Sequence, residues 1–232
     1  MDSFLQLQSA VQLYMSVGSE SVFISPEAVK LALNMAYRKV GGLFRWPDLE
    51  DAKKTSTISG QEYYDFPRTW RPNSAWKLEI DGKDQGDPIN FKDYLYEKEN
   101  NYPSGSTKMW GNQWRRFFID PVPTTNGSFN LVIWGFRNVE TLVEDADVTI
   151  FSYAQPEVNE ALVLEAVAIL KAKKEKGNEG IMFSLEAKQI VSVAWSRVKQ
   201  DLSKYEKTLP FFDVPDFFGS NQTGVKNNIG KF

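Results

Sequence analysis

The chain has 232 residues and a net charge of −3, with 42% hydrophobic and 25% charged residues, which is typical of a globular protein with its own core. The small negative charge argues against nucleic-acid binding as the main task, because phosphate contacts need clustered Lys and Arg. The chain has no Cys and no His. This excludes disulfides, thiolate nucleophiles and Cys-based zinc sites, and removes the commonest general acid/base and transition-metal ligand.

Nothing in the sequence indicates a membrane segment. The longest apolar run, Ala161–Leu170, is interrupted by Glu165 and is too short to cross a bilayer. Met1-Asp2-Ser3 lacks the basic flank and apolar block of a signal peptide. We therefore expect a soluble chain that is not exported and does not contact a membrane.

Two helices are predicted in residues 1–53. The apolar positions of the first follow helical spacing: Phe4, Leu7, Val11 and Tyr14. This helix should end near Gly18. Ser25-Pro26-Glu27 predicts the start of the second, with Ser as the cap, Pro at the first helical position and an acid in the first turn. The second helix should run to Gly41-Gly42.

Residues 54–150 change to the two-residue period of strands. An opening pair, Thr55–Ser59 and Gln61–Phe66, is predicted around Gly60. Further strands are predicted at Trp76–Ile80, Gln113–Ile119 and Phe129–Trp134, with a short helix over Phe91–Asn100. The block holds five of the seven Trp residues. We expect a small antiparallel β-sandwich or barrel.

Residues 151–208 predict two more helices. The first opens at Pro156 and ends at Gly177-Asn178; the second begins near Ser184 and fades after Tyr205. The apolar side of the second is predicted to hold Leu185, Ile190, Val193, Ala194, Trp195 and Val198. Each helical block is too small to hold a core by itself. We therefore predict an α+β fold in which N- and C-terminal helices form one bundle and the β module is inserted between them.

Residues 209–232 predict an extended C-terminal tail that docks on another protein. Two prolines block a helix, and the phenylalanines are too apolar for a free tail. The candidate anchors are Phe211, Phe212, Val214, Phe217, Phe218 and Phe232. The alternative is a tail that folds back on its own domain.

The sequence supplies no catalytic constellation. It has no Walker loop, G-x-G-x-x-G or G-x-S-x-G motif. Asp81, Asp84 and Asp87 do not have the ligand spacing of an EF-hand loop. The acids Glu140, Glu144, Asp145 and Asp147 are interpreted as turn residues rather than a hydrolase pair. We expect no enzyme activity, no catalytic residue, no cofactor and no metal.

Trp76, Trp110 and Trp114 form a candidate docking platform on the β module for carbohydrate, or for a fibre or nozzle protein. Packing of these tryptophans in the core of the module is the alternative.

Four segments carry a family resemblance through their order. They are Phe23–Val29 continuing through Leu33–Val40, Ser59–Pro67, Phe117–Pro123 followed by Phe129–Trp134, and Glu160–Ala168. Together they resemble the head-to-tail adaptor (connector, or head-completion) proteins of tailed bacteriophages. The likeness spans roughly residues 1–206. Residues 81–111 are longer and more polar than the family pattern, and the tail from Leu209 lies outside it.

The resemblance implies a non-enzymatic structural virion protein in the head–tail neck, assembled in the host cytoplasm. Such adaptors form a ring, typically dodecameric, that joins the portal to the tail and continues the DNA channel. The implied partners are other copies of the chain, the portal protein, and tail, nozzle or fibre proteins. DNA would pass without sequence-specific binding. The alternative is an aromatic-rich β module that binds carbohydrate or a fibre.

Overall fold

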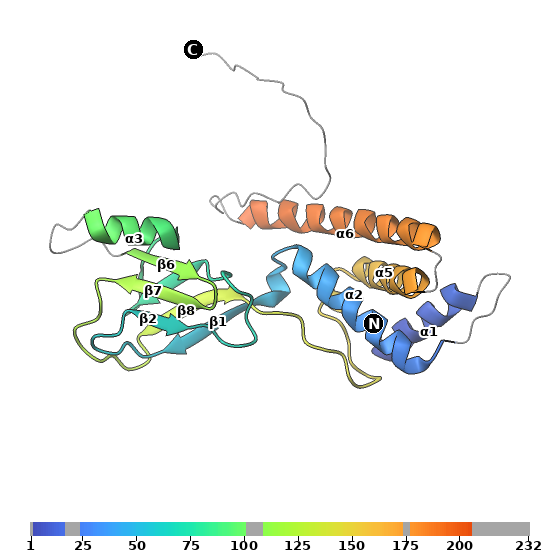
Figure 1. Cartoon of the computed structure of the whole chain (residues 1–232), viewed down its shortest axis with the longest axis horizontal. Coiled ribbons are helices and arrows are strands. Elements are labelled where there is room, and N and C mark those ends of the chain that lie inside the picture. The colour runs from blue at the N-terminus through green and yellow to red at the C-terminus, as the bar shows by residue number, and fades with distance from the viewer. Residues whose placement is uncertain (1, 17–23, 101–108, 174–176, 206–232) are drawn as a thin grey trace, which may run out of the picture. The chain divides into compact units, whose positions relative to one another are not determined.

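The computed structural model describes residues 2–16, 24–100, 109–173 and 177–205 (Figure 1). The α-helices are α1 (Phe4–Ser16), α2 (Pro26–Leu43), α3 (Phe91–Asn100), α4 (Phe151–Ala154), α5 (Glu157–Lys173) and α6 (Gly177–Tyr205), and a 3-10 turn spans Pro47–Leu49. The strands are β1 (Glu50–Thr55), β2 (Tyr63–Asp65), β3 (Lys77–Ile80), β4 (Lys83–Asp84), β5 (Ile89–Asn90), β6 (Met109–Gln113), β7 (Arg116–Asp120) and β8 (Leu131–Phe136). The predicted α+β class is confirmed. Residues up to Trp195 form one compact unit, and a second begins at Ser196.

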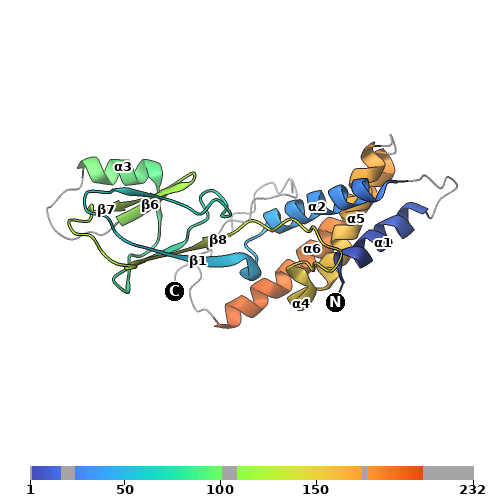
Figure 2. The same cartoon turned by 90° about the horizontal axis from the view of Figure 1, so that it is seen from below.

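Helix α5 is the centre of the helical bundle. Every side chain from Ala161 to Ala168 is buried. Both α1 and α2 pack on α5, although the whole β module separates them in sequence. Figures 1 and 2 show these blue and orange helices side by side in two perpendicular views. The predicted split bundle is therefore present.

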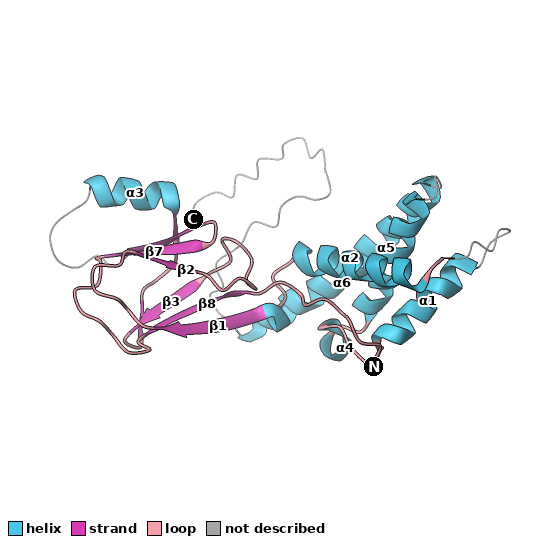
Figure 3. Cartoon of the chain, turned by 60° about the horizontal axis from the view of Figure 1, so that its bottom comes forward, coloured by secondary structure: helices cyan, strands magenta, loops and turns pink. Residues whose placement is uncertain are grey.

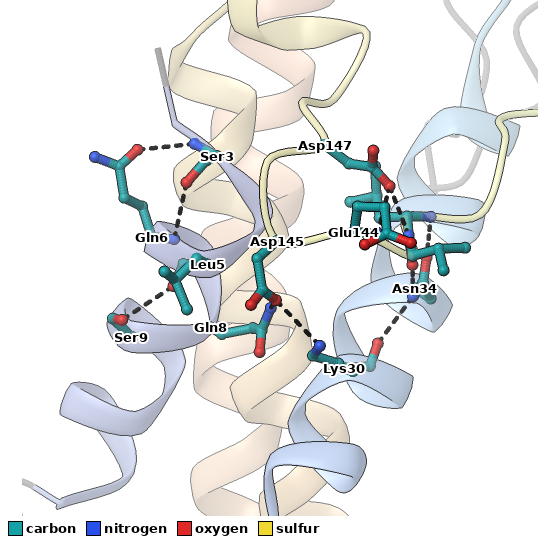
Figure 4. A network of polar contacts seen from close by, with 12 residues as sticks. Ser3, Leu5, Gln6, Gln8, Ser9, Lys30, Asn34, Glu144, Asp145 and Asp147 are labelled. Atoms are coloured by element: carbon teal, nitrogen blue, oxygen red, sulfur yellow. Dashed lines mark hydrogen bonds and ion pairs between the residues drawn. The ribbon is translucent and has the colours of Figure 1, made fainter.

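Local signals start the two N-terminal helices. The Ser3 backbone N–H donates to Gln6 Oε1 (2.8 Å), while the Gln6 N–H donates to Ser3 Oγ (3.3 Å), a reciprocal capping box (Figure 4). Ser25 caps α2 by accepting from the Ala28 N–H at 3.3 Å, with Pro26 as the first helical residue. The predicted start of α2 is therefore confirmed.

Aromatic rings join the end of α2 to α4 and α6. Trp46 is fully buried, and its ring centroid lies 4.9 Å from Phe151 and 5.3 Å from Trp195. Phe44 stacks on Trp195 at 4.9 Å. Rings in these edge-on and stacked arrangements add stabilisation beyond the area they bury. The junction therefore fixes where the chain leaves the bundle for the β module.

One buried acid links three helices of the bundle. Glu165 of α5 accepts from Lys39 of α2 and from Ser184 of α6, the latter at 2.9 Å. A buried carboxylate is stable only when it is paired and hydrogen-bonded. These two bonds to Glu165 therefore hold α2 and α6 against the same turn of α5.

The inserted module is a sandwich of two four-stranded sheets, shown as magenta arrows in Figure 3. Their strand orders are β1-β8-β3-β4 and β2-β7-β6-β5. Long antiparallel pairs form the ladders, with Glu50 opposite Phe136 and Thr55 opposite Leu131 in one sheet. The short pair β5–β6 is parallel, so the module is not wholly antiparallel.

Both sheets contribute to one apolar core. Its members are Tyr64, Phe66, Trp70, Ala75, Leu78, Trp110, Phe117, Ile119, Leu131 and Ile133. Strand β8 alternates buried and half-buried residues from Leu131 to Trp134, as expected for a strand with one face on the core. The core explains why Trp70 and Trp110 are buried.

Several predicted boundaries and faces are wrong. β1 begins at Glu50, inside the block assigned to the N-terminal helices, and the opening strand pair is shifted. Helix α6 begins at Gly177 rather than near Ser184. On α6, Leu185 and Val193 are exposed, whereas Ala187, Val191 and Ala194 are buried. Small residues bring α6 close to α5, where Gly180 lies against the backbone of Ala168.

Residues 137–150, named here the return segment, lead the chain from β8 back to the bundle. Buried Asn34 of α2 forms two hydrogen bonds with Leu142: its Nδ2 donates to the carbonyl (3.0 Å), and its Oδ1 accepts from the N–H (2.9 Å). The N–H groups of Phe4 and Leu5 donate to the carbonyls of Asp147 (2.7 Å) and Asp145 (3.1 Å). Figure 4 shows this segment between α1 and α2.

Replacing Asn34 with Ala should therefore destabilise the protein. The change leaves buried backbone groups of Leu142 without partners, and we expect a loss of about 2 kcal/mol in the free energy of unfolding. Urea unfolding followed by circular dichroism measures it. The matched control is Arg38→Ala, which removes an exposed 2.8 Å bond from the same helix to Thr141 of the same segment. Equal losses for both variants would show that the buried Asn34 bonds contribute no more to the free energy of unfolding than the exposed Arg38 bond.

Candidate functional site

The predicted portal-docking anchors Phe211, Phe212, Val214, Phe217, Phe218 and Phe232 lie outside the described residues. Within the described chain, the candidate binding features are exposed aromatic side chains at the two ends of the β-sandwich. Binding residues are commonly found on loops held by a rigid scaffold.

Trp114 lies at the tip of the β6–β7 hairpin and is 66% exposed. Its φ of 55° is in the left-handed region, which is unfavourable for a bulky residue. The hairpin is nevertheless fixed: the Asn73 N–H donates to the Trp114 carbonyl and the Phe66 N–H to the Arg115 carbonyl, both at 2.8 Å. Arg115 Nη2 also donates to the Pro67 carbonyl at 3.0 Å. The structure thus holds an exposed indole on a strained but well-anchored turn.

The three tryptophans of the predicted platform do not share a surface. Trp110 is only 1% exposed, belongs to the core, and donates from Nε1 to the Gly86 carbonyl at 2.7 Å. Trp76 is half-buried, and its buried Nε1 has no hydrogen-bond partner among the described residues. The prediction of a platform is therefore wrong for Trp110, because alternation along β6 turns its side chain between the sheets. Trp114 is the exposed member of the three.

A second exposed aromatic lies at the opposite end of the sandwich. The hairpin of Trp114 precedes β7, whereas the loop of Phe129 follows it, so the two side chains lie at opposite ends of that strand. Phe129 is 72% exposed and also has a positive φ, 48°. Exposed Ile58 lies on the neighbouring loop.

Asn130 fixes the loops around Phe129. Its Oδ1 accepts from the Thr57 N–H at 2.9 Å, and its Nδ2 donates to Asp81 Oδ1 at 3.0 Å. The Phe129 N–H itself donates to Ser56 Oγ at 3.0 Å. Sequence reasoning placed Phe129 at the start of a strand and missed its exposure. The Asn-Gly turn signal at Asn126 was the available clue to a tight loop here.

Helix α3 is anchored to the second sheet through Glu62. This carboxylate accepts from Tyr94 Oη at 2.9 Å and from Lys98 Nζ. Partial burial raises the pKa of Glu62, but the bonds from Lys98 and Tyr94 and the charge of Lys98 outweigh it, so the pKa of Glu62 is lowered overall. The rings of Phe91 and Tyr94 also lie against Phe118, at 4.7 and 5.9 Å.

The acids of the return segment have structural partners. Asp147 Oδ2 accepts from the N–H groups of Val143 (2.7 Å) and Glu144 (2.9 Å), and Glu140 pairs with Arg137. A hollow of about 390 Å³ lies beside them, against Tyr37 of α2. Burial raises the pKa of Tyr37 to about 12, and its hydroxyl accepts from the Ile150 N–H at 2.9 Å. These contacts brace the return segment against α2.

Two further searches covered the described residues only. No group of acidic side chains there is placed to hold a metal ion. No helix in the same part of the chain is long and apolar enough to span a bilayer.

No protein-family model matches this chain, and no curated protein sequence matches it.

Replacing Trp114 with Asn should stabilise the protein. Asn tolerates the left-handed conformation, so relief of strain should raise the free energy of unfolding by about 0.5–1 kcal/mol. Thermal unfolding measures it, with Trp110→Phe as the control that alters the core instead. A loss of stability in Trp114→Asn would show that the indole is a packing residue and not a displayed one.

The Glu62 cluster predicts a pH dependence. Because the pKa of Glu62 is lower in the folded chain, its stabilising effect is present above the unfolded value of about 4.3 and is lost as pH falls through the folded pKa. Below about pH 5, the melting temperature of Glu62→Gln should therefore fall less steeply with decreasing pH than that of the wild type. Asp65→Asn, which removes an exposed ion pair with Arg116 on the adjacent strand, is the control. Identical pH profiles for wild type and Glu62→Gln would contradict this assignment.

Proposed function

We propose that this chain is a head-to-tail adaptor of a tailed bacteriophage. In this proposal it is a non-enzymatic virion protein whose copies form a ring that joins the portal to the tail and continues the DNA channel. The observation that carries the proposal is the split helical bundle, with α1 and α2 packed on α5 across an inserted β-sandwich. This is the arrangement implied by the four ordered segments that resemble the adaptors.

The two ends of the sandwich support a role in contacts with other proteins. Trp114 and Phe129 are held exposed on turns whose backbone is fixed by hydrogen bonds. Aromatic side chains that become desolvated in a partner's pockets dominate binding energies at interfaces. We assign these two ends to tail, nozzle or fibre proteins.

The charge of the chain fits a channel that conducts DNA without gripping it. The net charge is −3. Strong binding to DNA needs several Lys or Arg contacts to phosphate. A ring of such subunits would let DNA pass without sequence-specific binding.

The C-terminal tail is the proposed hook for the portal. Its proline pair and its apolar anchors Phe211, Phe212, Phe217 and Phe218 are the sequence features that favour docking in a groove on another protein. This part of the proposal rests on the sequence alone.

Deleting residues 209–232 should leave a folded chain that no longer joins the portal. Co-sedimentation with purified portal particles and circular dichroism measure the two properties. Within the full-length chain, Phe217→Ser with Phe218→Ser should weaken portal binding at least about tenfold, since each buried aromatic contributes more than 1 kcal/mol. The matched control replaces polar positions of the same tail, Asn227→Ser with Asn228→Ser. Normal portal binding by the truncated chain would refute the hook.

A carbohydrate-binding module is the second candidate function, and exposed Trp114 is the observation that favours it. A sugar ring stacked on this indole would quench its fluorescence. Oligosaccharides that quench the wild type but not Trp114→Asn would favour this function over the adaptor.

A further inference from the structure

Helix α1 presents an uncharged ridge to solvent. From Ser3 to Ser16 the sequence contains no charged residue. Leu5, Ser9 and Leu13 are four residues apart, so they form one line along the helix, and Leu13 is 64% exposed. This line is named the α1 ridge. Surface helices usually carry charged residues, and this one has none. Depletion of charged residues is typical of the centre of a protein interface.

Helix α6 presents a second apolar surface. Ile181, Met182, Leu185 and Val193 are all exposed, with Met182 at 68%. This set is named the α6 face. Glu186 is also exposed there and takes part in no ion pair among the described residues. The two helices therefore each have an apolar surface that the described part of the chain leaves uncovered.

The α1 ridge and the α6 face are both turned away from the contact between the two helices. The helices meet where the rings of Tyr14 and Phe183 lie 6.2 Å apart. At about 100° per residue, the ridge lies about 100–180° around α1 from Tyr14. By the same spacing, the four members of the α6 face lie about 80–160° around α6 from Phe183. One chain therefore cannot cover one surface with the other.

We propose that the α1 ridge of one copy packs on the α6 face of the next copy. Contact between two different surfaces is heterologous, or head-to-tail, which is the kind that generates a ring. This inference rests on the proposed function, whose ring it supplies with an interface. A nucleic-acid partner would need clustered basic residues, whereas the α1 ridge has none and the α6 face is bordered only by the separate Lys188 and Arg197.

Charge at the rim favours a second copy as the occupant. Lys171 Nζ lies 5.2 Å from the centroid of the Phe183 ring, and that ring contacts Tyr14 of α1. Lys171 is already paired with Glu179 of its own chain at 2.5 Å, so the unpaired cation at this end of α5, among the described residues, is exposed Lys173. In the proposed head-to-tail contact, Lys173 would approach Glu186 of the neighbouring copy. Opposite charges at the rim of an apolar contact set its orientation.

Site-directed crosslinking tests the contact, because the natural chain has no Cys. Leu13→Cys and Leu185→Cys are made singly, mixed at high concentration and oxidised. The mixture should give about tenfold more disulfide-linked dimer than either variant alone, since an unequal contact pairs unlike surfaces. The double variant should give a ladder of higher oligomers. The control pairs Leu13→Cys with Ile58→Cys, an equally exposed apolar position on the β module.

Three results would overturn the proposal. The first two are no excess of mixed dimer over the Ile58→Cys control, or more disulfide-linked dimer from either single variant alone than from the mixture. The third is a wild type that stays monomeric in sedimentation at high concentration. In the full-length chain, Leu13→Glu should weaken self-association by about tenfold or more. Unchanged circular dichroism would show that the variant is folded.

These outcomes are separable from a failure of the adaptor function. A ladder without portal binding leaves the contact standing and rejects the adaptor. Portal binding without a ladder rejects the contact and leaves the adaptor standing.

Discussion

The fold depends on closing the helical bundle across the inserted module. Helix α5 is buried on nearly all sides, so it has no stable position until α1 and α2 cover it. The two hydrogen bonds between Asn34 and Leu142 join positions 108 residues apart and set where the returning chain lies. A long insertion is tolerable because the entropy of closing a loop grows only slowly with its length. The closure of the bundle therefore determines which side chains of its helices are buried and which are exposed.

The β module is anchored to the end of α2, where the chain leaves the helical bundle. Arg71, from the loop after β2, donates to the carbonyls of Gly41 and Phe44 at the end of α2. A cation at a helix C-terminus is favourable because the last carbonyls lack intrahelical partners. Burial lowers the pKa of Arg71, and nearby Arg45 lowers it further, so the carbonyl bonds compensate a charge held partly away from water. The module thus begins from a fixed anchor.

The exposed apolar residues of the two parts differ in kind. Trp114 and Phe129 are single aromatics on strained turns, fixed by hydrogen bonds to their backbone. The α1 ridge and the α6 face are rows of aliphatic side chains on regular helices. Isolated, rigid aromatics suit insertion into a partner's pockets, whereas rows on helices suit packing against another helix. In the proposed ring, the former would contact tail proteins and the latter neighbouring copies.

Local chemistry in the sequence determined much of the secondary structure. The cap at Ser25-Pro26, the helix opening at Pro156 and the two-residue period of β8 all predicted elements that the structure contains. The split bundle also followed, because neither helical block has enough apolar surface to fold alone. Only tertiary structure decided which apolar residues are buried. Trp110 and Trp114 are four residues apart on one hairpin, yet one is in the core and the other is at the tip. On α6, which is apolar on more than one side, close packing of Ala187, Val191 and Ala194 left Leu185 and Val193 outside. The spacing of apolar residues shows that a helix has an apolar face. When a helix has more than one such face, the elements packed against it determine which one is buried.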